Sequence, residues 1–131
     1  MKLLLDTHIW LWSLLDPERL SGRVTKALLN TANEIWISPI SMWEILTLCQ
    51  KKRLALRPSA SLWISTAFEK SPVKEATLTS EVVMATEQVS LPHRDPADLF
   101  LAASAKAYGL TLVTADERLL RGKGYQMLAN R

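Results

Sequence analysis

The chain has 131 residues, of which 48% are hydrophobic and 22% are charged, and its formal net charge is +3. Both charge signs are spread along a chain that has enough apolar residues for one core, which excludes disorder and predicts a single domain over residues 1–131. The small basic excess favours an anionic partner only mildly, because basic surfaces attract phosphate.

The N-terminus and the single cysteine bear on the cellular compartment. Residues 1–5 form an apolar run that resembles the start of a signal peptide, but Asp6 and His8 end it far short of a signal-peptide core or a membrane span. Cys49 lies among apolar residues and has no second cysteine to pair with. We therefore expect a cytoplasmic protein without a membrane segment.

The first half of the chain alternates short apolar runs with helical patterns. A buried strand is expected from Lys2 to Asp6, followed by a helix from Thr7 to about Leu15 that ends before Pro17. Serine caps, the second followed by proline in the first turn, predict two further helices around a short β-rich run. These elements are a helix over 21–32, a strand over 35–37 and a helix over 38–52.

The second half continues the alternation. Asp95-Pro96 opens a helix that runs through Tyr108, and Gly109 stands in the usual position after its last turn. The remaining patterns predict helices over 59–70 and 79–89, a strand that ends in a loop over 73–78, and strands over 111–114 and 125–128.

Short apolar strands separated by helices indicate an α/β fold, a three-layer α/β/α sandwich with a mainly parallel central sheet. In such sheets the ligand site lies beyond the carboxyl ends of the strands, near the point where the strand order reverses. Residues that follow strands are therefore the first candidates for function.

Two aspartates follow strands. Asp6 ends the first strand, and Asp116 comes shortly after the strand at 111–114. Each could be a simple N-cap of the helix that follows it, so neither is a strong signal alone. Two more aspartates open the helix near residue 96, where Asp95 is the better cap and Asp98, one turn in, can project toward the strand ends.

Glu44 is a carboxylate on a helix that is apolar nearly all round. It could form a capping box with Ser41 if that helix began late. No lysine or arginine lies within reach on the helix, however, and a partly buried carboxylate is costly unless it is paired or binds a metal. We therefore expect Glu44 to face a site.

Asp6, Glu44, Asp98 and Asp116 would meet near one sheet edge, contributed by separate stretches of chain. Such carboxylates repel one another unless a divalent cation neutralises them, and an all-oxygen ligand set suits Mg²⁺ or Mn²⁺. A site of this kind supports hydrolysis of phosphodiesters by an activated water without a protein nucleophile.

The segments that hold these acids resemble those of a known protein family. Four segments look like PIN-domain ribonucleases, and most like the VapC-type toxins of prokaryotic toxin–antitoxin pairs, in the same order and over essentially the whole chain. The segments are Leu5-Asp6-Thr7-His8, Ser41-Met42-Trp43-Glu44, Asp95-Pro96-Ala97-Asp98 with 101–105 after it, and Leu112-Val113-Thr114-Ala115-Asp116.

The resemblance implies an α/β/α sandwich that binds one or two Mg²⁺ or Mn²⁺ ions and cleaves single-stranded RNA. It implies that Asp6, Glu44, Asp98 and Asp116 are the catalytic and metal-binding acids and that Thr114 supports the site. It also implies a homodimer and a cognate antitoxin protein. Leu99-Phe100 depart from the family pattern, because many members carry a polar residue beside the aspartate.

Two other functions share part of this sequence pattern. A phosphoacceptor signalling domain has a similar length and a Mg²⁺ pocket, but it needs an acceptor aspartate on a central strand and a lysine at a later strand end. A PIN-like module that only binds RNA or protein is disfavoured by the presence of all four acids.

Aromatic and histidine residues gave weaker signals. Trp10, Trp36 and Trp43 lie in apolar runs and are expected in the core, whereas Trp12 is expected to be partly exposed, at a dimer or antitoxin surface. His8 is expected to pack near the first helix, and His93 is as well explained by a solvated loop position.

Overall fold

A computed structural model describes all 131 residues. The expected helices and strands form, with small shifts at their ends. In chain order they are β1 (Lys2–Leu5), α1 (Thr7–Leu15), the 3₁₀ turn η1 (Pro17–Arg19), α2 (Gly22–Leu29), β2 (Glu34–Ile37), α3 (Pro39–Gln50), α4 (Ala60–Lys70), β3 (Val73–Glu75), α5 (Ser80–Ala85), the 3₁₀ turn η2 (Thr86–Gln88), α6 (Pro96–Tyr108), β4 (Thr111–Thr114), α7 (Glu117–Leu120) and β5 (Gln126–Ala129).

The helix starts follow from side-chain caps. Ser21, Ser38, Ser59 and Thr79 each accept a hydrogen bond from a backbone N–H in the first turn of the helix that follows. At the other end of α6, Gly109 has a φ of 66°, in the left-handed region that favours glycine.

Two expected elements are shorter than the sequence predicted. α2 ends at Leu29 because Asn30 leaves helical geometry and its side chain accepts from the N–H of Ala32. The helix expected over 79–89 stops at Ala85 and tightens into a 3₁₀ turn. Neither change moves a strand of the sheet.

The sheet is parallel throughout and its strand order is β3-β2-β1-β4-β5. The chain moves outward from β1 through β2 to β3, then returns to the other side of β1 with β4. The order therefore reverses between β1 and β4, which is where ligand sites form in such sheets.

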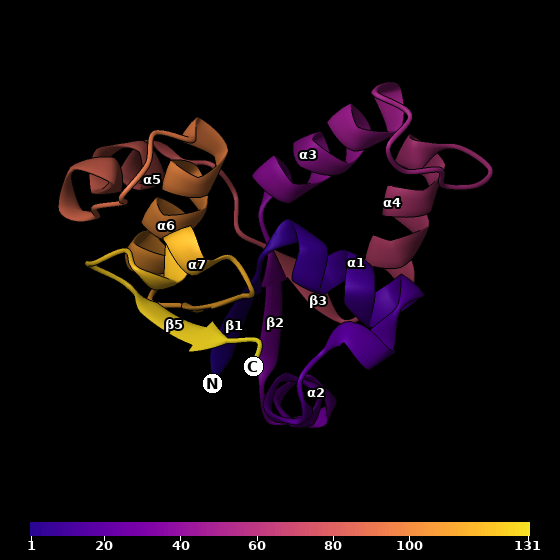
Figure 1. Cartoon of the computed structure of the whole chain (residues 1–131), viewed down its shortest axis with the longest axis horizontal. Coiled ribbons are helices and arrows are strands. Elements are labelled where there is room, and N and C mark those ends of the chain that lie inside the picture. Colours follow the sequence, from indigo (N-terminus) through magenta and orange to yellow (C-terminus); the bar gives the residue numbers. More distant parts are fainter.

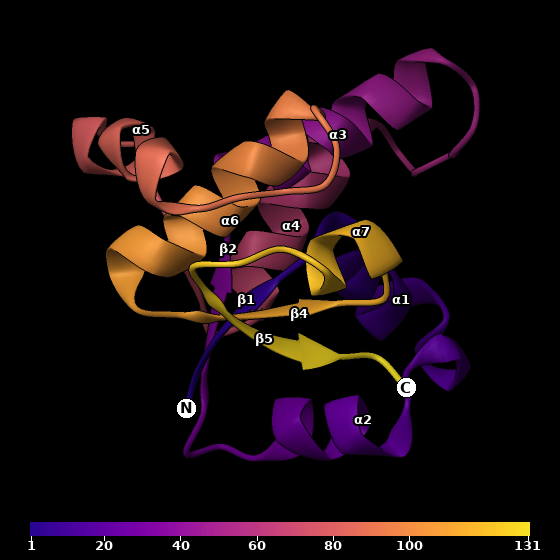
Figure 2. The ribbon, with the colours of Figure 1, turned by 60° about the vertical axis from the view of Figure 1, so that its left-hand side comes forward.

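Helices cover both faces of the sheet, as expected for an α/β/α sandwich. Leu3 and Leu5 of β1 face a core shared with α1, α2, α3 and α4, whereas Leu4 between them faces α6 and α7. Figure 2 shows α2 and α6 on opposite sides of the strands, and Figure 1 shows α3 and α4 set apart from the α5–α6 pair. None of the helices combines the length and apolarity needed to cross a membrane.

Candidate functional site

A pocket of about 380 Å³ opens at the carboxyl ends of β1 and β4. Its walls come from β1, α1, α3, α6 and the β4–α7 connection. The pocket brings together all four acids that the sequence singled out, Asp6, Glu44, Asp98 and Asp116. The helix-capping Asp95 and the basic Arg118 also line it.

Asp6 is held at the end of β1 by two hydrogen bonds. Its Oδ1 accepts from the Thr7 N–H at 2.7 Å, so the expected capping role is real, and its Oδ2 accepts from the Thr114 hydroxyl at 2.7 Å. Burial raises the pKa of Asp6 above its ordinary value, and the negative charge of Asp98 adds to this, although both hydrogen bonds oppose it. Both carboxylate oxygens are therefore fixed in place.

Asp116 begins α7 and is paired with Arg118. The Arg118 N–H donates to Oδ1 at 2.8 Å, and the Arg118 guanidinium lies 3.2 Å from Oδ2. Partial burial alone would raise the pKa of Asp116, but the hydrogen bonds and charge of Arg118 outweigh it and lower that pKa. Thr114 links this residue to β1, because its hydroxyl also accepts from the Asp116 N–H at 3.0 Å.

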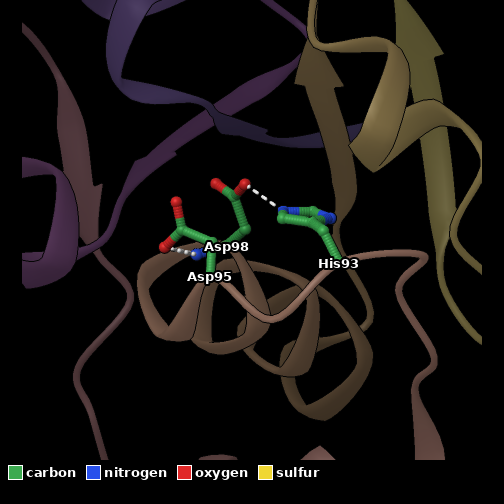
Figure 3. A group of neighbouring side chains, drawn as sticks. All are labelled: His93, Asp95 and Asp98. Atoms are coloured by element: carbon green, nitrogen blue, oxygen red, sulfur yellow. Dashed lines mark hydrogen bonds and ion pairs between the residues drawn. The ribbon is translucent and has the colours of Figure 1, made fainter.

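Asp98 and Asp95 stand on the first turn of α6, and their carboxylates rise to the same side of the helix (Figure 3). Asp95 caps the helix by accepting from the N–H groups of Ala97 and Asp98 at 2.9 and 3.4 Å, as expected. His93, on the preceding loop, places its Nε2 2.7 Å from Asp98 Oδ2. Burial raises the pKa of Asp98, and the His93 hydrogen bond partly offsets this rise.

Glu44 projects from α3 and is half-buried. It does not form a capping box, because Ser38 caps this helix; instead the Thr7 hydroxyl donates to its Oε1 at 2.6 Å. Burial, helped by the negative charges of Asp6 and Asp98, raises the pKa of Glu44 to about 7, although the hydrogen bond from Thr7 opposes the rise. Glu44 therefore gains and loses a proton near neutral pH.

Sequence reasoning missed two residues of the site, His93 beside Asp98 and Arg118 in the pocket lining. For His93 a solvated loop position was an equal alternative, but only 15% of its side chain is exposed and it contacts Asp98. Arg118 was given no role in the site. Its place two residues after a helix-capping aspartate was the signal for a local ion pair, since the cap fixes the first turn around that aspartate.

Other expectations were wrong about exposure. His8 is exposed rather than packed. Trp43 is 58% exposed. On α3 it is the next residue, Glu44, that turns toward the pocket. Trp10 is buried as expected, and Trp36 is half-buried.

The acidic cluster has the donors that a metal ion needs. His93, Asp95 and Asp98 each offer one ligand atom within 4.8 Å of the others. Burial raises the pKa values of Asp6, Asp98 and Glu44, and repulsion from the neighbouring carboxylates adds to the rise. A cation bound there would relieve this repulsion.

The sequence comparisons agree with this geometry. The family model for the PIN domain matches residues 3–124. The chain is also 34% identical over 119 residues to Ribonuclease VapC22 from Mycobacterium tuberculosis, a match that covers 88% of each protein.

Solved structures share the fold. VapBC2 from Rickettsia felis, bound to a DNA fragment from its promoter, superposes with a TM-score of 0.73 at 19% identity and covers 98% of each chain. DNA-bound VapBC from Salmonella typhimurium gives a TM-score of 0.72 at 22% identity, over 100% of this chain and 99% of the other. The chain therefore belongs to the PIN domain family, a family of nucleases.

Proposed function

We propose that this protein is a metal-dependent endoribonuclease that cleaves single-stranded RNA and acts as the toxin of a toxin–antitoxin pair. The observation that carries the proposal is the meeting of Asp6, Glu44, Asp98 and Asp116 in one pocket beside the β1–β4 junction. The similarity to Ribonuclease VapC22 supports the reaction and the RNA substrate. The phosphoacceptor alternative loses its support, because the chain matches a nuclease family.

The donor set fits a hard divalent cation, Mg²⁺ or Mn²⁺. In this proposal Asp6 and Asp98 hold the ion most directly, and Glu44 and Asp116 complete the site directly or through water. Thr7 and Thr114 engage the two oxygens of Asp6, and His93 engages Oδ2 of Asp98, which fixes the direction in which each carboxylate points. Burial is the main cause of the raised pKa values of both acids and repulsion between carboxylates adds to it; a cation bound there would favour their charged forms.

When bound, such an ion would activate a water and stabilise the negative charge that develops at the phosphorus oxygens. The protein's own groups act on position and protons. Thr7 and Thr114 orient Glu44 and Asp6. The Thr7 hydrogen bond holds the Glu44 carboxylate in the pocket beside Asp6 and Asp98, where it would accept a proton from the attacking water.

The partners are proposed from the neighbours. The solved structures that share the fold are described as VapBC assemblies, one of them as a member of a toxin–antitoxin family. We extend this to a cognate antitoxin that holds the protein inactive and to a homodimer of the toxin chain.

To test the proposal, purified wild type and Asp98→Asn are incubated with a mixed pool of single-stranded RNA in Mg²⁺, in Mn²⁺ and in EDTA, and cleavage is measured. We expect metal-dependent cutting that the variant loses. RNA binding without cutting in any metal would favour a binding module that has lost catalysis, and neither cutting nor binding would overturn the proposal.

A further inference from the structure

Two aromatic side chains of α1 share the pocket with the acids. His8 and Trp12 are four residues apart and so lie on the same helix face, with their ring centroids 5.9 Å apart and their planes tilted by 52°. Both line the pocket together with Asp6 and Asp116. The acidic floor therefore has an aromatic wall on one side.

Contacts with residues outside the pocket lining hold the Trp12 ring in place. The side chain packs partly against the core beneath α1, and the Arg19 guanidinium carbon lies 4.9 Å from its ring centroid. Arg19 is itself paired with Asp16 at 3.7 Å. The indole is half-buried and His8 is exposed, so part of the aromatic wall faces the open pocket.

An aromatic ring face beside a phosphate-cleaving centre suits a nucleobase. Every base has a π-face, and proteins that bind single strands stack unpaired bases on aromatic side chains.

We propose that Trp12 and His8 form a nucleobase subsite, in which a base flanking the cleaved phosphodiester stacks on the Trp12 ring. This subsite rests on the proposed ribonuclease function and specifies where its substrate is gripped. It requires an unpaired base next to the cut, which gives the preference for single-stranded RNA a physical origin.

The first test compares Trp12→Leu and Trp12→Phe with wild type on one RNA oligonucleotide whose cleavage position has been mapped. Loss of one stacked base should raise KM by roughly 5- to 150-fold in Trp12→Leu, with kcat nearly unchanged because the base contact is the same before and during the reaction. Trp12→Phe keeps an aromatic ring and should recover most of the loss. Trp43→Ala is the matched control, since Trp43 is exposed on α3 outside the pocket.

The second test removes the base instead of the ring. Abasic nucleotides are placed in turn on each side of the cleaved bond. At one position the abasic RNA should raise the wild-type KM as much as Trp12→Leu does, and the variant should show no further rise with that RNA. Additive effects, an unchanged KM in Trp12→Leu, or an equal loss in Trp43→Ala would overturn the subsite.

The two proposals fail differently. Wild type that cuts intact RNA while both Trp12 variants keep its KM rejects the subsite and leaves the ribonuclease standing. If wild type does not cut, fluorescence anisotropy with the same intact and abasic oligonucleotides makes the same comparison on Kd. Thermal unfolding of each variant establishes that it is folded. If Trp12→Leu is not, Trp12→Met takes its place in the same comparison, because methionine can fill the apolar contact beneath α1 but has no ring face.

Discussion

The Thr114 hydroxyl donates a 2.7 Å hydrogen bond to Oδ2 of Asp6, across the junction where the strand order reverses. Thr114 is fully buried, and the same hydroxyl accepts from the Asp116 N–H at 3.0 Å. One side chain on β4 therefore ties together acids that follow two different strands. A shift of the Thr114 side chain would therefore displace both Asp6 and Asp116.

Thr114→Val should lower activity while leaving the fold intact. Valine has nearly the same shape but cannot donate to Asp6, so the pKa of Asp6 should rise further and its carboxylate should lose a fixed direction. We expect kcat/KM for RNA cleavage to fall about 10- to 100-fold, the range typical for groups that orient metal ligands. Thr114→Ser keeps the hydroxyl and should retain most activity; equal losses in both variants would contradict the orienting role.

Asp6→Asn should abolish cleavage without destabilising the metal-free protein. Asp6 is 9% exposed, its pKa is raised by burial, and Asp98 repels it, so removing the charge removes a cost of folding. In EDTA the Tm of the variant should equal or exceed that of wild type, whereas RNA cleavage in Mg²⁺ should disappear. Full activity in this variant would sink the assignment of Asp6 to the metal.

The metal-free protein should lose stability as the pH rises from about 4.5 to about 7. Glu44 has a pKa of about 7 when folded against 4.5 ordinarily, so in this window the folded state binds more protons than the unfolded state. Stability is therefore present below the lower value and is lost as the pH rises through the higher one. Glu44→Gln carries no such proton and should lack this part of the slope.

Urea unfolding in EDTA at several pH values, for wild type and Glu44→Gln, measures the difference. Parallel profiles would show that Glu44 does not titrate in this window. Saturating Mg²⁺ should oppose the trend, because a metal ion binds the deprotonated carboxylates.

Local signals made much of the fold predictable. α1 and α6 have the expected bounds because a cap or a proline fixes each start within a few residues of sequence. The expected meeting of Asp6 and Asp116 follows from the parallel sheet, since both come directly after strands that are neighbours. The short turns η1 and η2 were not predicted, because their three-residue patterns carry too little periodicity.

The rest of the site depends on contacts between distant loops. His93 reaches Asp98 only because the segment before α6 is folded back, where Ser90 pairs with Lys123 through two backbone hydrogen bonds of 2.9 and 3.0 Å. Nothing in the local sequence specifies this bridge. The exposure of Trp43 was missed for a related reason. Its neighbours in the sequence are apolar, but the packing of α3 against the rest of the fold decides which of its faces is covered.

Gly124→Ala should destabilise the protein through that bridge. Gly124 has a φ of 99°, which alanine adopts only with strain, and an added Cβ would overlap the Gln88 carbonyl oxygen. The backbone cost alone is about 1–2 kcal/mol, and the overlap with a main-chain atom adds to it. Gly22→Ala is the control, because a Cβ there meets nothing within 4 Å. Thermal unfolding should show a lower Tm for Gly124→Ala only, and a Tm equal to that of Gly22→Ala would mean that the loop holding Gly124 can rearrange without loss.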